Sequence, residues 1–81
     1  METRVAVISI IIENPESVQT LNELLHQYSP YIIGRMGIPY REKNLSILSV
    51  AMDAPQPVIS ALAGKLGMLP GVSTKTLYSK A

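Results

Sequence analysis

Two segments of the chain are apolar on both of their alternating faces, and no other feature constrains the fold as much. They are TRVAVISIII, residues 3–12, and LSILSVAMD, residues 45–53. Both have the length of a strand and are rich in Val, Ile and Leu. A strand covered on one face alone alternates apolar with polar residues, so these runs predict central strands that are covered on both faces.

The segment after the first run has the pattern of an amphipathic helix. In ENPESVQTLNELLHQYS, residues 13–29, Asn14 is a good N-cap and Pro15 fits the first helical position. Ser29 and Pro30 end the helix, because a residue before proline disfavours helical geometry. The apolar residues at helical spacing predict about three turns, buried through Val18, Leu21, Leu24, Leu25 and Tyr28.

A second helix follows the other apolar run. The segment APQPVISALAGKLG, residues 54–67, comes after Asp53 and carries two prolines at its start. Gly67 is the expected C-cap glycine, because helices commonly end on a residue with left-handed geometry. The residues predicted to form the buried stripe are Val58, Ile59, Leu62, Ala63 and Leu66.

Two weaker strands are expected at the edges of the sheet. Residues 31–38 hold two glycines and an arginine just before Pro39, and residues 72–80 are polar and basic. An edge strand tolerates such residues because one of its sides has no partner strand. Residues 1–81 therefore predict one α+β domain of order βαββαβ, a ferredoxin-like four-stranded antiparallel sheet with the first and third strands central.

This arrangement leaves one face of the sheet open, because two helices can cover only the other face. The open face exposes aliphatic side chains from both central strands. An apolar patch of that size marks an interface. We expect a homo-oligomer, a dimer or a tetramer, that associates through the open sheet face.

The composition excludes several classes of partner. The chain has 81 residues and a formal net charge of +1, and its Lys and Arg residues are scattered rather than clustered. Direct nucleic-acid binding needs a basic footprint, so we expect none. The lack of cysteine excludes thiolate metal sites and fits a cytoplasmic protein. No apolar run reaches the roughly 18 residues that span a membrane, so we expect no membrane partner.

The sequence lacks a recognisable catalytic or metal-binding pattern. His26 is the only histidine and the chain has no Cys, so we expect a structural or surface role and no metal site. The carboxylates suggest capping and solvated charge rather than an acid–base pair; they are Glu2, Glu13, Glu16, Glu23, Glu42 and Asp53. The expectation is a protein that is not an enzyme, and no cofactor can be identified.

The segment IIGRMGIPY, residues 32–40, holds the main candidate site. Gly34, Arg35, Met36 and Gly37 are candidates for ligand binding or for a subunit interface, because the glycines permit a bulge or a close backbone approach. Arg35 can hold an anionic small-molecule effector by a two-pronged contact. The alternative is an edge strand blunted by a charge, with Arg35 paired to a neighbouring subunit. By alternation, the two faces of this strand are Ile33, Arg35 and Gly37 against Gly34, Met36 and Ile38.

The segments RVAVI, LNELL, IGRMGIP, ISALAGKLG and GVSTKTLYSK follow one another along the chain. Together they resemble a family of small bacterial proteins named as regulators of the iron-only (FeFe) hydrogenase system, and the resemblance spans essentially the whole chain. The family's fold is similar to ACT domains and to the C-terminal regulatory domain of nickel-responsive repressors. The resemblance implies a small-molecule-sensing or assembly role in anaerobic metabolism.

Two departures limit what this resemblance implies. ACT domains commonly carry Pro-Gly after the first strand, where the glycine leaves room for an amino-acid effector; here the chain reads NPES, and Glu16 occupies that place. Asn14 and Ser17 remain as candidates at the helix N-terminus. Nickel sensing needs several His and a Cys, whereas this chain has one His and no Cys.

Three functions are compatible with these observations. The first is a non-enzymatic regulatory or small-molecule-sensing module that acts as an oligomer through a partner or a ligand. The alternative is a structural interaction module without a ligand. A small ferredoxin-like enzyme with its site between subunits is the third.

Overall fold

The computed structural model describes residues 2–80 of the chain. Its order of strands and helices is the predicted one, and most boundaries differ by one or two residues. The first α-helix begins at Val18 rather than at Pro15, because residues 15–17 form a 3₁₀ turn. Short 3₁₀ turns lie before and after the first helix and between the second and third strands. The strands are β1 Arg4–Ile12, β2 Ile32–Tyr40, β3 Leu45–Ala54 and β4 Val72–Tyr78, and the helices are α1 Val18–Gln27 and α2 Gln56–Gly67.

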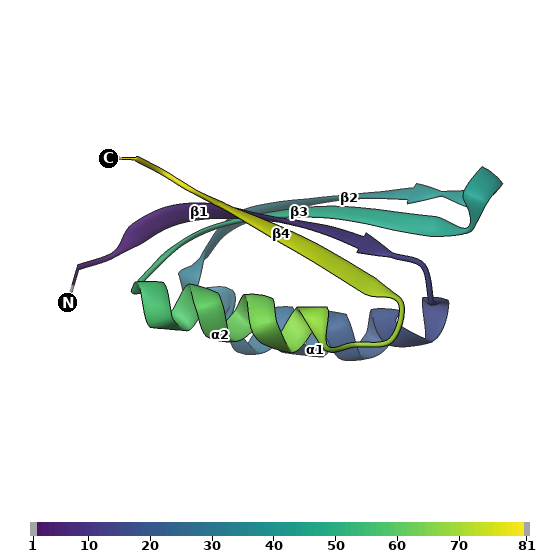
Figure 1. Ribbon diagram of the computed structural model, residues 1–81, viewed down its shortest axis with the longest axis horizontal. Helices are drawn as coiled ribbons and strands as arrows, with labels where there is room; N and C mark the ends of the chain where they lie inside the picture. Colours follow the sequence, from purple (N-terminus) through teal and green to yellow (C-terminus); the bar gives the residue numbers. More distant parts are fainter. Residues whose placement is uncertain (1, 81) are drawn as a thin grey trace.

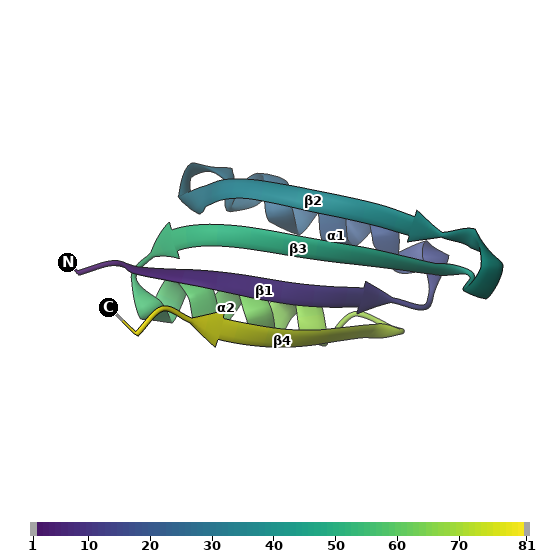
Figure 2. The ribbon, with the colours of Figure 1, turned by 90° about the horizontal axis from the view of Figure 1, so that it is seen from above.

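The four strands form one antiparallel sheet in the order β2-β3-β1-β4. The apolar strands β1 and β3 are central and the weaker strands are at the edges, as predicted. Both helices lie on the same side of the sheet (Figure 1). Seen from the opposite side, α1 lies behind β2 and β3, and α2 lies behind β1 and β4 (Figure 2). The α+β, ferredoxin-like arrangement is confirmed.

The core lies between the sheet and the two helices. Residues directly opposite each other on antiparallel strands share a face. The pairs Ile8–Val50 and Ala6–Met52 face the helices, and all four side chains are at most 1 % exposed. The predicted helix stripes are confirmed: Leu21, Leu25, Ile59, Leu62 and Leu66 are fully buried, and Val18, Leu24, Tyr28, Val58 and Ala63 pack at the margin.

The opposite face of the sheet is apolar and is left open by the described part of the chain. Its central pairs include Ile11–Ile47 and Val7–Ala51. Ile11 is 43 % exposed and Ile47 is 39 % exposed, although both belong to the most apolar strands. Figure 2 looks onto this face. The other large, exposed apolar side chains of the open face are Val5, Met36, Ile38, Tyr40 and Leu77.

The edge strand β2 is longer than predicted at its C-terminal end. It continues through Pro39 to Tyr40, whereas the sequence placed its end at Ile38. Pro39 pairs with Ser46 of β3. A proline lacks one ladder donor, which an edge strand tolerates because only one of its sides has a partner.

A β-bulge near the start of β2 breaks the strict alternation of its side chains. Ile32 and Gly34 pair with consecutive residues of β3, so Ile33 is the extra residue. Arg35 is opposite the buried Val50 and therefore lies on the helix side of the sheet. Arg35 and Gly37 share this side, as alternation predicted, whereas the bulge interrupts the alternation at Ile33 and puts Ile32 on the helix side as well.

The predicted C-cap glycine is also wrong. Gly67 is the last residue of α2, and Met68 follows as the C-cap with right-handed geometry. The glycine with a positive φ, 69°, is Gly71, at the entrance to β4. A Cβ atom there would lie 2.6 Å from the Cβ atom of Asn14, and the Gly71 carbonyl accepts a hydrogen bond from the Glu13 backbone amide at 2.7 Å. Gly71 thus permits the β1–α1 and α2–β4 loops to touch.

Candidate functional site

The open sheet face has a hollow at its centre. Ser9 of β1 and Ser49 of β3 are paired, and their small side chains lie between larger neighbours. Ile11 and Ile47 form the next pair on this face, about 7 Å further along the strands. The hollow has a volume of about 340 Å³, and Lys75 of β4 is at its border. The face therefore has an apolar ridge beside a cavity with small side chains.

The β2 side of this face carries the candidate residues Gly34 and Met36. Met36 pairs with Ser49, is 64 % exposed and lies on the open face, so it is placed for an interface between chains. Gly34 pairs with Ala51 and so belongs to the open face, and a Cβ atom at Gly34 would meet nothing within 4 Å. Gly37 is opposite Leu48 and lies on the helix side with Arg35.

Arg35 lines a second pocket, of about 480 Å³, between β2 and the C-terminal half of α1. Its guanidinium Nη2 donates a hydrogen bond of 2.9 Å to Oδ1 of Asn22 on α1. His26 and Ser29 add two more polar groups to the lining. The remaining lining residues are apolar; they are Leu25 and Ile32. The pocket thus combines one cation, three neutral polar side chains and an apolar floor. We name it the Arg35 pocket.

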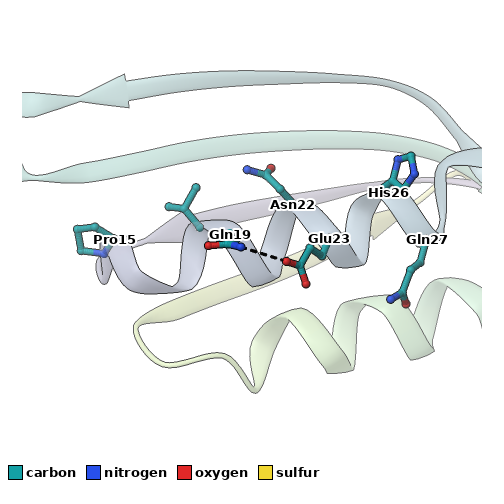
Figure 3. A pocket seen from close by; sticks show the side chains of 7 residues that line it. Pro15, Gln19, Asn22, Glu23, His26 and Gln27 are labelled. Carbon is teal, nitrogen blue, oxygen red and sulfur yellow. Dashed lines mark hydrogen bonds between the residues drawn. The ribbon is translucent and has the colours of Figure 1, made fainter.

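A wider groove of about 790 Å³ runs along the exposed side of α1. The side chains that line it come from this helix and from Pro15 just before it (Figure 3). Asn22 and His26 point toward the strands, and Gln19 donates a hydrogen bond to Glu23. Because its walls come from one helix, the groove is open, and it shares Asn22 and His26 with the Arg35 pocket.

The structure places the two helix N-terminus candidates in structural contacts. The Asn14 side chain accepts a hydrogen bond of 3.0 Å from the Glu16 backbone amide, which is the predicted capping contact. Ser17 is 4 % exposed, and its hydroxyl donates a 2.6 Å hydrogen bond to the Pro70 carbonyl oxygen. A ligand-binding role for these two residues stays a prediction.

Residues 2–80 contain neither a cluster of metal ligands nor a membrane-spanning helix. No group of three or more His, Cys, Asp or Glu side chains is placed there to hold a metal ion. None of the described helices is long and apolar enough to cross a membrane.

Comparison with known proteins identifies the family. Residues 4–76 match the model of the TM1266-like family, described as "Iron-only hydrogenase system regulator, putative". The chain belongs to the TM1266-like family. No curated protein matches the chain. A solved structure, that of the uncharacterized protein TM1266 from Thermotoga maritima, is similar over 98 % of this chain and 100 % of its own, with 36 % sequence identity and a TM-score of 0.93.

Membership of the TM1266-like family confirms the resemblance seen in the sequence. The sequence also singled out Arg35, but it missed the residues beside it. Asn22 and Ser29 carry no signal of their own, and His26 was assigned a structural or surface role. Only the packing of α1 against β2 brings these side chains to Arg35, since Asn22 and Arg35 are 13 residues apart in the chain.

Proposed function

We propose that the chain is a non-enzymatic regulatory protein of an iron-only hydrogenase system that acts as an oligomer of identical chains. The family description supports the regulatory role. The observation that carries the oligomer is the open sheet face, where the pair Ile11–Ile47 is exposed on the two central strands. A small domain buries only about 60–65 % of its unfolded surface by itself, so covering this face would add substantially to its core.

The shape of the open face favours a second copy of the same chain as the partner. A two-fold interface brings the same patch from both chains together, so each patch must complement itself. Here the ridge formed by Ile11 and Ile47 lies directly beside the hollow at Ser9 and Ser49. A two-fold axis between ridge and hollow would place each ridge in the hollow of the partner. We therefore expect a dimer as the basic unit.

The test of the interface is the mass of the protein in solution. We expect the wild-type chain to sediment as a dimer or tetramer at micromolar concentration, and Ile47→Lys to sediment as a monomer. The substitution places a charge in the centre of an apolar contact, which is costly when the charge is unpaired. Ile11→Lys serves as a second variant, and circular dichroism checks that both variants are folded.

The matched control for this test is Met68→Lys. Met68 is 85 % exposed at the end of α2, away from the open face, so the same gain of charge should leave the mass unchanged. A monomeric wild-type chain at micromolar concentration would overturn the proposed assembly. The proposed assembly would also be overturned if Ile47→Lys kept the mass of the wild-type oligomer while Met68→Lys became a monomer.

The regulatory role is tested in cells that lack the chromosomal copy of the gene. We expect the wild-type chain and Met68→Lys to restore the normal level of hydrogenase activity, and the monomeric Ile47→Lys to fail at equal abundance. A deletion that leaves hydrogenase activity and its response to growth conditions unchanged would overturn the regulatory role, whatever the mass of the protein.

A further inference from the structure

We propose that the Arg35 pocket binds a small organic anion, with its carboxylate or phosphate group on Arg35 and its apolar part against Ile32. This inference deepens the regulatory function proposed above, because it names the class of effector and its place. The pocket is built from α1 and β2 of a single chain. Its occupancy is therefore measurable independently of the assembly.

The exposed guanidinium of Arg35 makes a hydrogen bond to α1 and still has free donors. An arginine carries five N–H donors in a planar fork. Within the described residues, the side chain makes one hydrogen bond, to Asn22 Oδ1. This bond ties the end of a long side chain to a helix, which lowers the entropy that a ligand would otherwise have to remove. The other donors remain for the two oxygens of a carboxylate or phosphate.

The charge balance of the pocket favours an anion. Its described lining has no Asp or Glu, so no carboxylate in the pocket competes for the guanidinium. Lys65 and Arg4, by contrast, are engaged within the chain: the Lys65 ammonium donates to the Tyr28 hydroxyl at 3.0 Å, and Arg4 donates to the Ser79 carbonyl and stacks on a tyrosine ring. Arg35 lies in a pocket lined also by the polar side chains of Asn22, His26 and Ser29.

The rest of the lining sets the size and character of the ligand. A volume of about 480 Å³ falls within the range of ordinary small-molecule sites. His26 and Ser29 lie in the lining as further hydrogen-bonding groups for the anionic end or its neighbours, and the half-buried Ile32 offers an apolar wall. These features fit an anion with a short hydrocarbon part better than a bare inorganic ion.

The test is a titration of the isotope-labelled protein with matched probes, followed by backbone amide shifts in NMR spectra. Phenylacetate and phenyl phosphate present the two anionic groups, and phenylacetamide presents the same ring without the charge. We expect saturable binding of at least one anion, with shifts concentrated at Asn22, His26 and Arg35, and much weaker binding of phenylacetamide. The anion that binds more tightly identifies the charged group that the pocket prefers. Inorganic phosphate and acetate lack the ring, so their affinities show how much the ring contributes to the affinity.

Variants of the pocket and of the surface separate a site from general charge attraction. Arg35→Gln should lower the affinity by about tenfold or more, because it removes the charged donor. Asn22→Asp, which has nearly the same shape, should also lower the affinity, since its carboxylate would pair with Arg35. Lys43→Gln removes one exposed positive charge outside the pocket and should bind like the wild-type chain.

Each alternative outcome contradicts the proposal. Failure of both anions to bind saturably would overturn it, as would equal binding of phenylacetamide. Equal losses in Arg35→Gln and Lys43→Gln would assign the effect to net charge alone. The Ile47→Lys variant keeps all pocket residues and should still bind the anion as a monomer, so failure of the assembly and failure of the ligand site can be distinguished.

Discussion

At the scale of single residues, the fold depends on a few positions whose backbone or contacts allow one kind of side chain. Gly71 is the clearest, because its φ of 69° and its contact with Asn14 both exclude a Cβ atom. The contact joins two loops that come from opposite ends of the chain. The residue is needed for packing between loops rather than for the turn alone.

We expect Gly71→Ala to lower the free energy of unfolding by about 1–2 kcal/mol from backbone strain alone, and by more if the Asn14 contact cannot relax. Urea denaturation measures this change. Gly64→Ala is the control: Gly64 lies inside α2, a Cβ atom there meets nothing within 4 Å, and alanine should stabilise the helix by about 0.5–1 kcal/mol. A neutral Gly71→Ala variant would contradict the argument from geometry.

At the scale of elements, the start of α1 is tied to the loop before β4 by a side chain. The buried Ser17 hydroxyl donates to the Pro70 carbonyl, and the Glu13 amide donates to the Gly71 carbonyl in the same region. These contacts fix the position of α1 along the sheet. The hydroxyl of Ser17, a candidate ligand-binding residue in the sequence, is thus used for a contact inside the chain.

Ser17→Ala should therefore lower the free energy of unfolding by about 0.5–1.5 kcal/mol, because the hydrogen bond from the buried Ser17 hydroxyl to the Pro70 carbonyl is lost. Thr20→Ala, at an exposed position of α1, should be neutral or slightly stabilising, since alanine is the better helix former. Thermal and urea unfolding of the two variants provide the comparison. Equal stability of both would show that the Ser17 contact contributes nothing.

At the scale of the whole molecule, the chain is elongated, with a longest extent of 41 Å, and its sheet carries helices on one side only (Figure 1). One chain therefore has a core on one face of the sheet and an apolar surface on the other. The two proposed functions use different parts of this molecule: the assembly uses the open face, and the anion site lies at the edge between α1 and β2.

If the open face is buried between chains, the unfolding temperature must depend on protein concentration, because dissociation accompanies unfolding. For a dimer of this size we expect a rise of about 3–6 °C for each tenfold increase in concentration. Scanning calorimetry or circular dichroism at several concentrations measures it. The folded, monomeric Ile47→Lys variant should show no such dependence, and a flat wild-type response would count against the dimer.

Much of this structure could be predicted from the sequence. The two apolar runs, the capping residues of the first helix and the spacing of its leucines were enough for the order of elements, the central strands and the buried helix stripes. The end of β2 and the C-cap of α2 were wrong. The end of β2 was missed because a proline is tolerated in an edge strand. The C-cap of α2 was missed because the sequence does not show whether a glycine at the end of a helix has a positive φ.

The sequence by itself determined that β1 and β3 each have two apolar faces, because their residues are apolar at odd and even positions alike. A face that the helices do not cover must therefore be an open apolar surface or be covered by another chain. Only the tertiary structure decided which set faces the helices, since alternation cannot choose between two apolar faces. The same holds for Arg35: only the sheet register placed it on the helix side, a bulge in β2 put Ile32 on that side too, and the packing of α1 against β2 supplied Asn22 as its partner. Register and helix packing are long-range properties, so local sequence patterns do not encode them separately.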